Sequence, residues 1–519
     1  MEDKDGSQFI FQSVRYRAIR DNLDIELKDA VAEFNIFEDL SKSYLTGSIL
    51  IGDDTGLMDE VKTKGDERVT LIIAKNPAIS EGEPYFRLDF KVVSILRQEK
   101  TADRAEVLSL NLISDYAYNN SVIKISKSYT GKLEKISESI LKNFLDVELA
   151  LKEFDLLTGK PIDTEVRPDE GRITRKYYDD EQGSEQEAIK LLVPYLSPLE
   201  TVEWLTERAT DRWGTPFFLW ASIWGQDMSE TTTLRLGNFM TMVQEGITSL
   251  NDQTEKTDFI YSQVQTNLKA PEGYKGAMRI IKGIKLSNIE NTLKMIREGA
   301  VGSTISNLDT YTTQSISKLY SATRFLNSLN GGGPQSDPED EFAPYPNQGG
   351  KILGTVFDQQ DQLRIADEVR PTSYWSARQR STVTSYGTYA STNSIHEAID
   401  DSSLLNKVRP LALRSMLARN MIEIMVDGIG ILEDKLSVGD IIKVQFVTED
   451  TESRALGGSN LERSGYYLIQ NCRHIFAEER HDVVLMICKV AQTEIINDDS
   501  LYEPSELSEV VVTAQRRGI

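Results

Sequence analysis

The stretch GDERVTL at 65–71 has a weaker counterpart near the other end of the chain, GDIIKVQ at 439–445. In both, a Gly-Asp turn leads into residues that favour a β-strand. Each is followed by an aromatic-led strand and then by an apolar hairpin arm. These later segments lie at 85–88 and 107–112 in the first copy, and at 466–469 and 483–487 in the second. The pattern predicts two copies of one β-barrel module; the alternative is a chance similarity between β-hairpins.

Apolar and polar residues alternate in the segments on either side of both stretches. Phe86, Leu88 and Phe90 alternate with polar residues, and so do Leu108 and Leu110. A period of two places one side-chain face against a core and the other toward solvent. The sequence predicts an α+β, mainly β fold. We expect the following segments to build the two barrels: 45–51, 65–73, 421–426 and 439–446.

The middle of the chain is more helical. Apolar residues at 133–144 fall on one helical face. Ser197, Pro198 and Glu200 form a helix start, with a capping serine, proline in the first turn and the glutamate of a capping box. The segment 217–220 (FFLW) is typical of a buried strand.

Glycine, proline and acidic residues at 330–350 predict a linker. The following domains are expected: 1–120, a first barrel; 121–279, a mixed helical and strand insertion; 280–328, the start of a second barrel; 329–419, a linker, irregular segment and helix inserted in that barrel; 420–492, its remainder; and 493–519, an acidic tail.

Composition narrows the class of protein. The chain has 519 residues, 39% of them hydrophobic and 27% charged, a balance typical of a soluble globular protein. No apolar run is long enough to span a bilayer, and the N-terminus lacks the features of a secretory signal, so we expect synthesis in a cytoplasm and no membrane anchor. Cys472 and Cys488 lie in strand-like segments and are expected to be buried, reduced thiols.

The net charge of −23 argues against specific nucleic-acid binding, which needs a basic surface to displace counterions. An acidic channel wall, in contrast, would let DNA pass without binding it. Ordinary solubility is the simpler explanation of the charge.

Motifs of known catalytic sites are missing from the sequence. There is no phosphate-binding glycine loop, no nucleophile elbow and no His-Glu-x-x-His pair. The three histidines, His396, His474 and His481, are expected to be packing or surface residues. Acidic turns at 53–56 and 498–499 lack the twelve-residue calcium-loop pattern. We therefore expect no enzyme, and no catalytic, cofactor-binding or metal site; only a paired-carboxylate glycosidase stays open, because carboxylates are abundant.

Several segments, in their order along the chain, resemble the baseplate central hub proteins of contractile-tailed bacteriophages. The N-terminal tube module of that family is similar to 39–51 (DLSKSYLTGSILI) with 65–71. Its middle is similar to 198–213 with 217–218, and its second barrel to 291–309 and 420–487. The resemblance touches most of 9–325 and 396–492.

The resemblance implies a homotrimeric, pseudo-six-fold ring with two tail-tube-like barrels per chain. Such a ring joins the tail tube to the central spike and lets DNA and the tape measure protein pass through its lumen. Implied partners are the tail tube, spike, tape measure and other baseplate proteins, and the implied location is the virion tail baseplate, after synthesis in the host bacterial cytoplasm. A hub or spike component of a type VI secretion or phage-like injection particle is the related alternative. A carbohydrate-active enzyme or adhesin is the alternative from another class.

Departures from the family pattern lie at 330–350, at 351–395 and in the long tail. In the tail, 510–517 (VVVTAQRR) is expected either to add an edge strand to a partner's sheet or to be a frayed end.

Overall fold

The structure is a computed structural model of the whole chain. It describes the following residues: 9–18, 23–53, 67–75, 84–100, 106–131, 133–152, 154–155, 160–161, 189–207, 215–226, 231–252, 258–261, 279–286, 299, 302–309, 315–322, 325, 378–384, 408–417, 421–446, 463–477 and 480–491. The expected linker at 330–350, His396, the acidic turn at 498–499 and the tail at 493–519 lie outside these residues.

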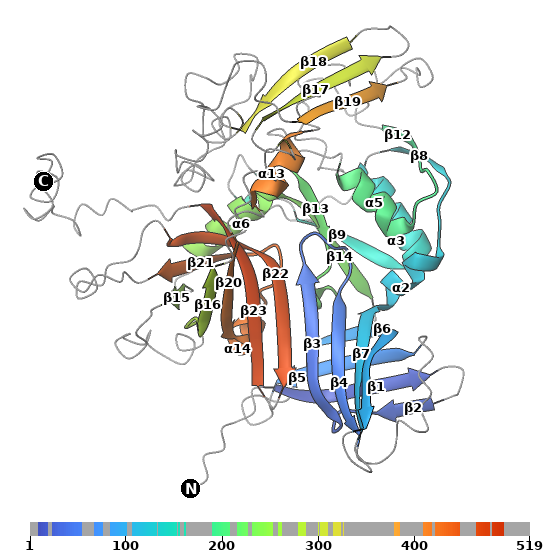
Figure 1. Cartoon of the computed structure of the whole chain (residues 1–519), viewed down its shortest axis with the longest axis vertical. Coiled ribbons are helices and arrows are strands. Elements are labelled where there is room, and N and C mark those ends of the chain that lie inside the picture. The colour runs from blue at the N-terminus through green and yellow to red at the C-terminus, as the bar shows by residue number, and fades with distance from the viewer. Residues whose placement is uncertain are drawn as a thin grey trace, which may run out of the picture.

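A large sheet of 13 strands dominates the fold (Figure 1). Its order is β16-β20-β23-β22-β3-β4-β7-β6-β5-β1-β2, with β21 pairing β22 and β15 pairing β21. The strands are β1 (Phe9–Ala18), β2 (Leu23–Glu26), β3 (Val31–Asp39), β4 (Thr46–Asp53), β5 (Arg68–Lys75), β6 (Pro84–Lys100), β7 (Glu106–Ser114), β15 (Phe259–Tyr261), β16 (Gly283–Leu286), β20 (Met421–Asp427), β21 (Ile441–Phe446), β22 (Gly465–Ala477) and β23 (Arg480–Ala491). The prediction of a mainly β fold is confirmed.

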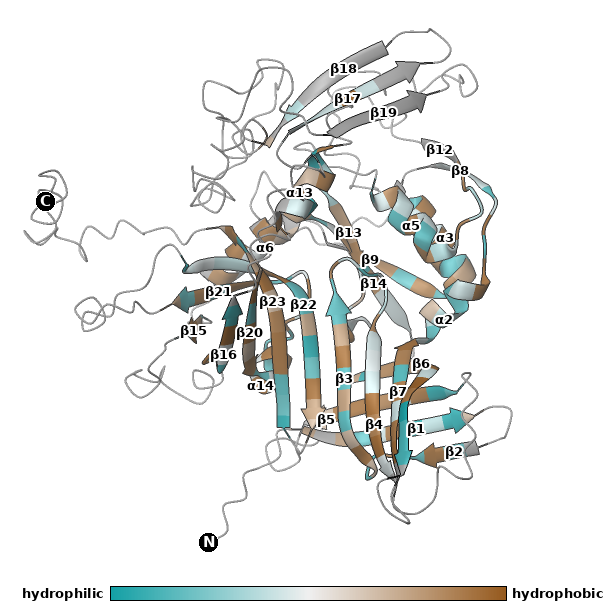
Figure 2. Cartoon of the chain, viewed as in Figure 1, coloured by the Kyte–Doolittle hydropathy of each residue, from teal (hydrophilic) through white to brown (hydrophobic). Residues whose placement is uncertain are grey.

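The alternation seen in the sequence sets the two faces of this sheet. On β5, Val69, Leu71 and Ile73 are fully buried, whereas Thr70 and Ile72 are half-buried. Figure 2 shows the resulting change between hydrophobic and hydrophilic residues along β3 and β4. Because successive side chains of a strand point to opposite faces, the apolar set of each strand is turned toward the core of its module.

The sheet contains one strand order twice. In the N-terminal module, which we define as β3 to β7, neighbours follow the order β5-β6-β7-β4-β3. In the C-terminal module, defined as β16 and β20 to β23, they follow β21-β22-β23-β20-β16. Every pairing within both series is antiparallel, and the strands occur in the same sequence along the chain. Two related β modules are therefore present, but the described strands form an open path rather than two closed barrels.

The strand pairing aligns the two modules differently from the Gly-Asp motifs: the two alignments differ by one residue. The Val92 amide donates to the Glu67 carbonyl at 2.9 Å, and the Ile469 amide donates to the Asp440 carbonyl at 3.0 Å. These matching bonds make Asp440 the equivalent of Glu67, so in the alignment Gly439 corresponds to position 66 rather than to Gly65. Gly439 has a φ of +88°, and a Cβ there would lie 2.8 Å from the Trp220 ring, which explains a glycine at this turn.

Helices and short strands also lie outside the large sheet: the helices at 115–145 and 198–206 lie above the N-terminal module, whereas those at 239–252 and 409–417 pack on the C-terminal module (Figure 1). The helices are α2 (Asp115–Val122), α3 (Leu133–Leu145), α5 (Pro198–Thr206), α6 (Phe239–Asp252), α13 (Arg409–Leu417), α14 (Gly428–Glu433) and the 3-10 helix η2 (Ile223–Gly225). The shorter strands are β8 (Ser128–Gly131), β9 (Val147–Lys152), β10 (Phe154–Asp155), β11 (Lys160–Pro161), β12 (Ile189–Leu192), β13 (Phe217–Trp220) and β14 (Thr232–Asn238). Helix α5 starts as expected, with the Glu200 carboxylate accepting the Ser197 amide at 2.9 Å.

A separate three-stranded sheet lies at one end of the molecule. It consists of β17 (Gly302–Asp309), β18 (Ser315–Ser321) and β19 (Arg378–Thr384), in the order β18-β17-β19. Strand β19 comes from the segment expected to be irregular. It pairs with β17, which pairs with β18 on its other side, so β17 and β18 belong to this sheet rather than to the large one. The domain boundaries expected from the sequence stay a prediction.

Two hydrophobic cores follow from this arrangement. One fills the N-terminal module and extends to α3, α5 and β13. The other fills the C-terminal module and extends to α6 and α13. Phe476 of β22 belongs to the N-terminal core, so the end of β22 is anchored in the other module. Among the described residues, no helix combines the length and the hydropathy needed to cross a membrane.

Candidate functional site

The two modules meet where β3 pairs with β22. Seven residue pairs join 33–39 to 471–477 in antiparallel register, and the Leu40 amide extends the contact by donating to the Gln470 carbonyl at 2.9 Å. Strand β22 has a register shift between Ile469 and Asn471. Before this shift one side of β22 pairs with β21, and after it the same side pairs with β3. We call the β3–β22 contact the internal seam; it makes the two modules one continuous sheet.

A buried carboxylate lies in the internal seam. Glu38 of β3 is 1% exposed. Its Oε2 accepts from the Ser437 hydroxyl at 2.6 Å, and its Oε1 lies 2.9 Å from His474 Nε2. The Ser222 and Ser437 hydroxyls lie 2.6 Å apart. Burying an unpartnered charge is costly, so these contacts hold together three parts of the chain: β3, the segment before η2 and the C-terminal module.

Two histidines continue this network into the C-terminal module. His474 Nδ1 lies 3.1 Å from His481 Nε2, across the hairpin of β22 and β23. A neutral pair satisfies these contacts when His481 Nε2–H donates to His474 and His474 Nε2–H donates to Glu38. Burial, followed by the nearby His474 and Lys282, holds the pKa of His481 well below its usual value. The ring of His481 stacks on Phe476 with centroids 4.1 Å apart.

The sequence placed both histidines beside a hairpin but did not indicate that they are fully buried or that Glu38 joins them. The signal that was available is their position on the facing arms of one hairpin. The two cysteines are buried and free, as expected.

Glu38, Cys472 and His474 place potential metal-ligand atoms within 4.8 Å of one another. Burial, with a smaller effect of Glu38, raises the pKa of the Cys472 thiol well above its usual value. A metal site needs the thiolate, and the Glu38 carboxylate already accepts two hydrogen bonds. The residues therefore fit a hydrogen-bonded cluster better than a metal centre.

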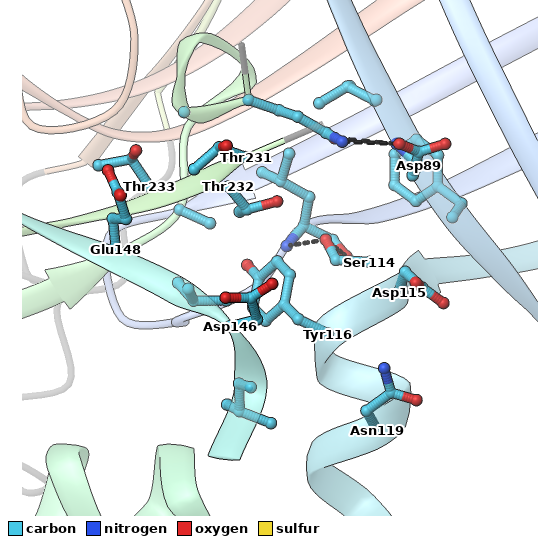
Figure 3. A pocket seen from close by; sticks show the side chains of 18 of the residues that line it. Asp89, Ser114, Asp115, Tyr116, Asn119, Asp146, Glu148, Thr231, Thr232 and Thr233 are labelled. Atoms are coloured by element: carbon cyan, nitrogen blue, oxygen red, sulfur yellow. Dashed lines mark hydrogen bonds between the residues drawn. The ribbon is translucent and has the colours of Figure 1, made fainter. Parts of the chain in front are cut away.

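A polar pocket of about 530 Å³ lies beside the N-terminal module. Four acidic side chains line it from different places: Asp89 from β6, Asp115 from α2, Asp146 from the turn before β9, and Glu148 from β9 (Figure 3). A paired-carboxylate glycosidase needs two carboxyl groups that face each other across a cleft of this kind.

The most buried of these carboxylates is fully engaged in structural contacts. Asp89 accepts from Thr70 Oγ1 at 2.6 Å and from Gln226 Nε2 at 2.7 Å, while its own amide donates to Gln226 Oε1 at 3.0 Å. Arg68 lies 3.5 Å from Asp89 and 3.4 Å from Asp115. These contacts anchor the turn at Gln226 on β6 and occupy the Asp89 carboxylate with structural partners, an arrangement that does not suit the general acid of a glycosidase.

No family model and no curated protein matches this chain. Solved structures of tail proteins do. A tail protein from Neisseria meningitidis is 10% identical, with 93% of this chain and 97% of that chain covered and a TM-score of 0.45. The 43 kDa tail protein of prophage MuSo2 from Shewanella oneidensis is 10% identical, with 92% and 98% covered and a TM-score of 0.43. A type VI secretion component, the E. coli c3393 protein, is 9% identical, with 90% and 76% covered and a TM-score of 0.35.

These neighbours belong to the two groups that the sequence resemblance names, phage tail proteins and type VI secretion proteins.

Proposed function

We propose that this chain is the structural hub of a contractile-tail baseplate, a homotrimeric pseudo-six-fold ring between the tail tube and the central spike. The observation that supports this most directly is the repeated strand order, with both copies joined edge to edge by the internal seam. One chain thereby supplies two equivalent sectors of a wall. Three chains supply six, the number needed to match a six-fold tube on one side and a three-fold spike on the other.

The internal seam also suits a part that carries load. Its backbone hydrogen bonds run between modules, and the Glu38 cluster ties the same junction to η2 and to Ser437. A force that separates the modules has to break these bonds together rather than one at a time. Two closed tube-like barrels are part of the proposal.

The net charge of −23 fits a channel through which DNA and the tape measure protein pass without binding. In this proposal acidic residues outnumber basic ones along the lumen, and the protein has no catalytic role. Virion tail location and contacts with tube, spike, tape measure and other baseplate proteins belong to the same proposal.

The first experiment measures the mass of the full chain in solution by native mass spectrometry and images the particles by electron microscopy. We expect a species of three times the chain mass of 58.5 kDa, with ring-shaped averages that have a central hole. A monomer in every buffer, which also fails to bind tube or spike protein, would overturn the proposal. A ring lined mainly by basic residues would contradict its explanation of the charge.

A further inference from the structure

The strand pairing aligns the two modules residue by residue, starting from the matching hydrogen bonds of the Val92 and Ile469 amides. Val92 lies opposite Leu112 of β7, and Ile469 lies opposite Ile487 of β23. In a sheet, each residue has a defined partner on the neighbouring strand. Counting along the paired strands from these two pairs therefore matches the other strand positions of the N-terminal module to those of the C-terminal module.

The cores of the two modules agree with this alignment. It matches Leu110 of β7 to Leu485 of β23, and the residues opposite them, Ile49 of β4 and Ile424 of β20, match each other. All four side chains are fully buried. The same residue therefore holds the same place in both cores at these two positions.

One surface position also carries the same residue in both modules. Arg97 of β6 lies opposite the residue before Leu110, and Arg473 of β22 lies opposite the residue before Leu485. Both pairings lie beyond the register shifts of β6 and β22, so the shifts do not disturb the match. Among the strand positions that the structure describes and that the alignment matches, no other exposed position has the same residue in both modules.

Both arginine side chains reach solvent, and each has an acidic neighbour. Arg97 is 60% exposed and forms an ion pair with Glu99 on the same strand. Arg473 is 45% exposed, lies 3.9 Å from Glu33 of β3 and donates through Nε and Nη2 to the Asn35 side-chain oxygen at 3.2 and 3.1 Å. A guanidinium has five N–H donors, so each arginine keeps donors for a further acceptor. Exposed ion pairs contribute little to stability, so both side chains can turn toward a partner.

The stagger between the two arginines fits a ring of tilted strands. The row of Arg97 runs through β7, β4 and β3 to Ala477 of β22, four residues beyond Arg473 and four strand steps away from β6. With the usual spacings within and between strands, equivalent positions are displaced by about 13 Å along the strands and about 19 Å across them, which corresponds to a strand tilt of about 35°. Strands of closed barrels tilt by about 35–45°. At that tilt, Arg97 and Arg473 lie at the same height around the axis of a ring.

We infer that Arg97 and Arg473 together form a belt of six guanidinium groups in the three-chain ring, and that each group binds a carboxylate of one subunit of the six-fold tail tube. This inference rests on the proposed hub and specifies its contact with the tube. A six-fold partner makes six equivalent contacts, so both modules must offer it the same group. A three-fold spike meets each chain once and does not need a repeated residue.

The occupant is a tube carboxylate rather than a DNA phosphate. Each arginine has a glutamate beside it, so the belt carries no local excess of positive charge that would hold a passing polyanion. A fixed protein surface, in contrast, can place one carboxylate opposite each guanidinium. Paired hydrogen bonds between the two planar groups then supply both affinity and orientation.

Removal of the guanidinium groups tests the belt. The full-length variants Arg97→Gln and Arg473→Gln should each weaken binding to purified tail tube protein of the same virion by about fivefold or more, and to a similar extent, because the tube uses both positions equally. The double variant should weaken binding by about fiftyfold or more. Arg17→Gln on β1 is the matched control: its side chain is 48% exposed, it pairs with Asp24 at 3.0 Å, and its loss should leave the affinity unchanged. The measurement is the dissociation constant by biolayer interferometry, with circular dichroism to show that each variant is folded.

The outcomes separate this inference from the proposed hub. A loss of tube binding from only one of the two positions, or from neither, would overturn the belt but not the hub. A duplex DNA of about 30 base pairs, measured by fluorescence anisotropy, should bind the wild type and the double variant equally weakly. DNA affinity that falls in the double variant would assign the arginines to DNA, and a double variant that no longer forms trimers in native mass spectrometry would assign them to the contact between chains; either result overturns the inference. A wild-type chain that never forms a trimer, or a trimer that does not bind the tube, would overturn the hub itself.

Discussion

At the scale of single residues, Glu38 has the largest effect on how the modules are joined. Two buried side chains that lie far away in the sequence, Ser437 and His474, contact its carboxylate. Removing it leaves Ser437 and His474 without their acceptor. A buried polar group that loses its partner costs far more than an exposed ion pair is worth.

We expect Glu38→Ala to lower the free energy of unfolding by about 2–4 kcal/mol, measured by urea denaturation. Glu38→Gln should cost less because the amide oxygen still accepts from Ser437. Glu138→Ala on α3, at an exposed pair with Lys135, is the control and should change stability by less than about 0.5 kcal/mol. Equal urea midpoints for the Glu38→Ala and Glu138→Ala variants would show that the buried cluster does not contribute to the free energy of unfolding.

His481 makes stability depend on pH. Its folded-state pKa is depressed, chiefly by burial, so below about pH 6.5 the unfolded chain binds a proton that the folded chain does not. The contribution of His481 to the free energy of unfolding is therefore fully present above about pH 6.5 and decreases as the pH is lowered from there. The expected slope approaches about 1.4 kcal/mol per pH unit.

The measurement is the urea midpoint at pH 7.5, 6.5 and 5.5 for the wild type and for His481→Phe, which keeps a ring stacked on Phe476. The variant starts less stable, because His474 loses a partner, but its stability should fall less between pH 6.5 and 5.5. Parallel curves for the two proteins would assign the acid sensitivity to other groups.

At the scale of elements, the sequence predicts where helices and strands begin and end better than it predicts which strands pair. The start of α5 follows from Ser197, Pro198 and Glu200 alone, and the structure shows this start. The strands were also found from alternation, because the period of two is a local property. The alignment of the two modules, in contrast, was off by one residue at the Gly-Asp turn, because a turn motif does not determine which strand residues face each other.

The helix start can be tested on its own. The Ser197 amide, followed by Lys124 and the Ser197 hydroxyl, lowers the pKa of Glu200 to about 2. The contribution of Glu200 to stability is therefore present above the pKa that it has in the unfolded chain, near 4.3, and is lost as the pH falls from there toward 2. Because the side chain is exposed, we expect Glu200→Gln to cost only about 0.5–1 kcal/mol at pH 7 and nothing near pH 2, measured by thermal unfolding. A cost that is unchanged at low pH would contradict the capping role.

At the scale of the whole molecule, the arrangement of edges matters more than any single site. The C-terminal module pairs its bent strand β22 with β3 of the N-terminal module, and this pair is the internal seam. A heterologous contact of this kind repeats until the rotation closes a ring.

Alternation and capping residues by themselves determined the mainly β class and the helix start at Ser197, because these depend on neighbours in sequence. The tertiary structure alone decided that β3 pairs with β22 and that Glu38 meets His474, 436 residues away. The physical reason is that the backbone of a strand edge offers the same hydrogen-bonding groups to any partner strand. Which edge it meets depends on how whole modules pack, and no local pattern around Glu38 contains that information.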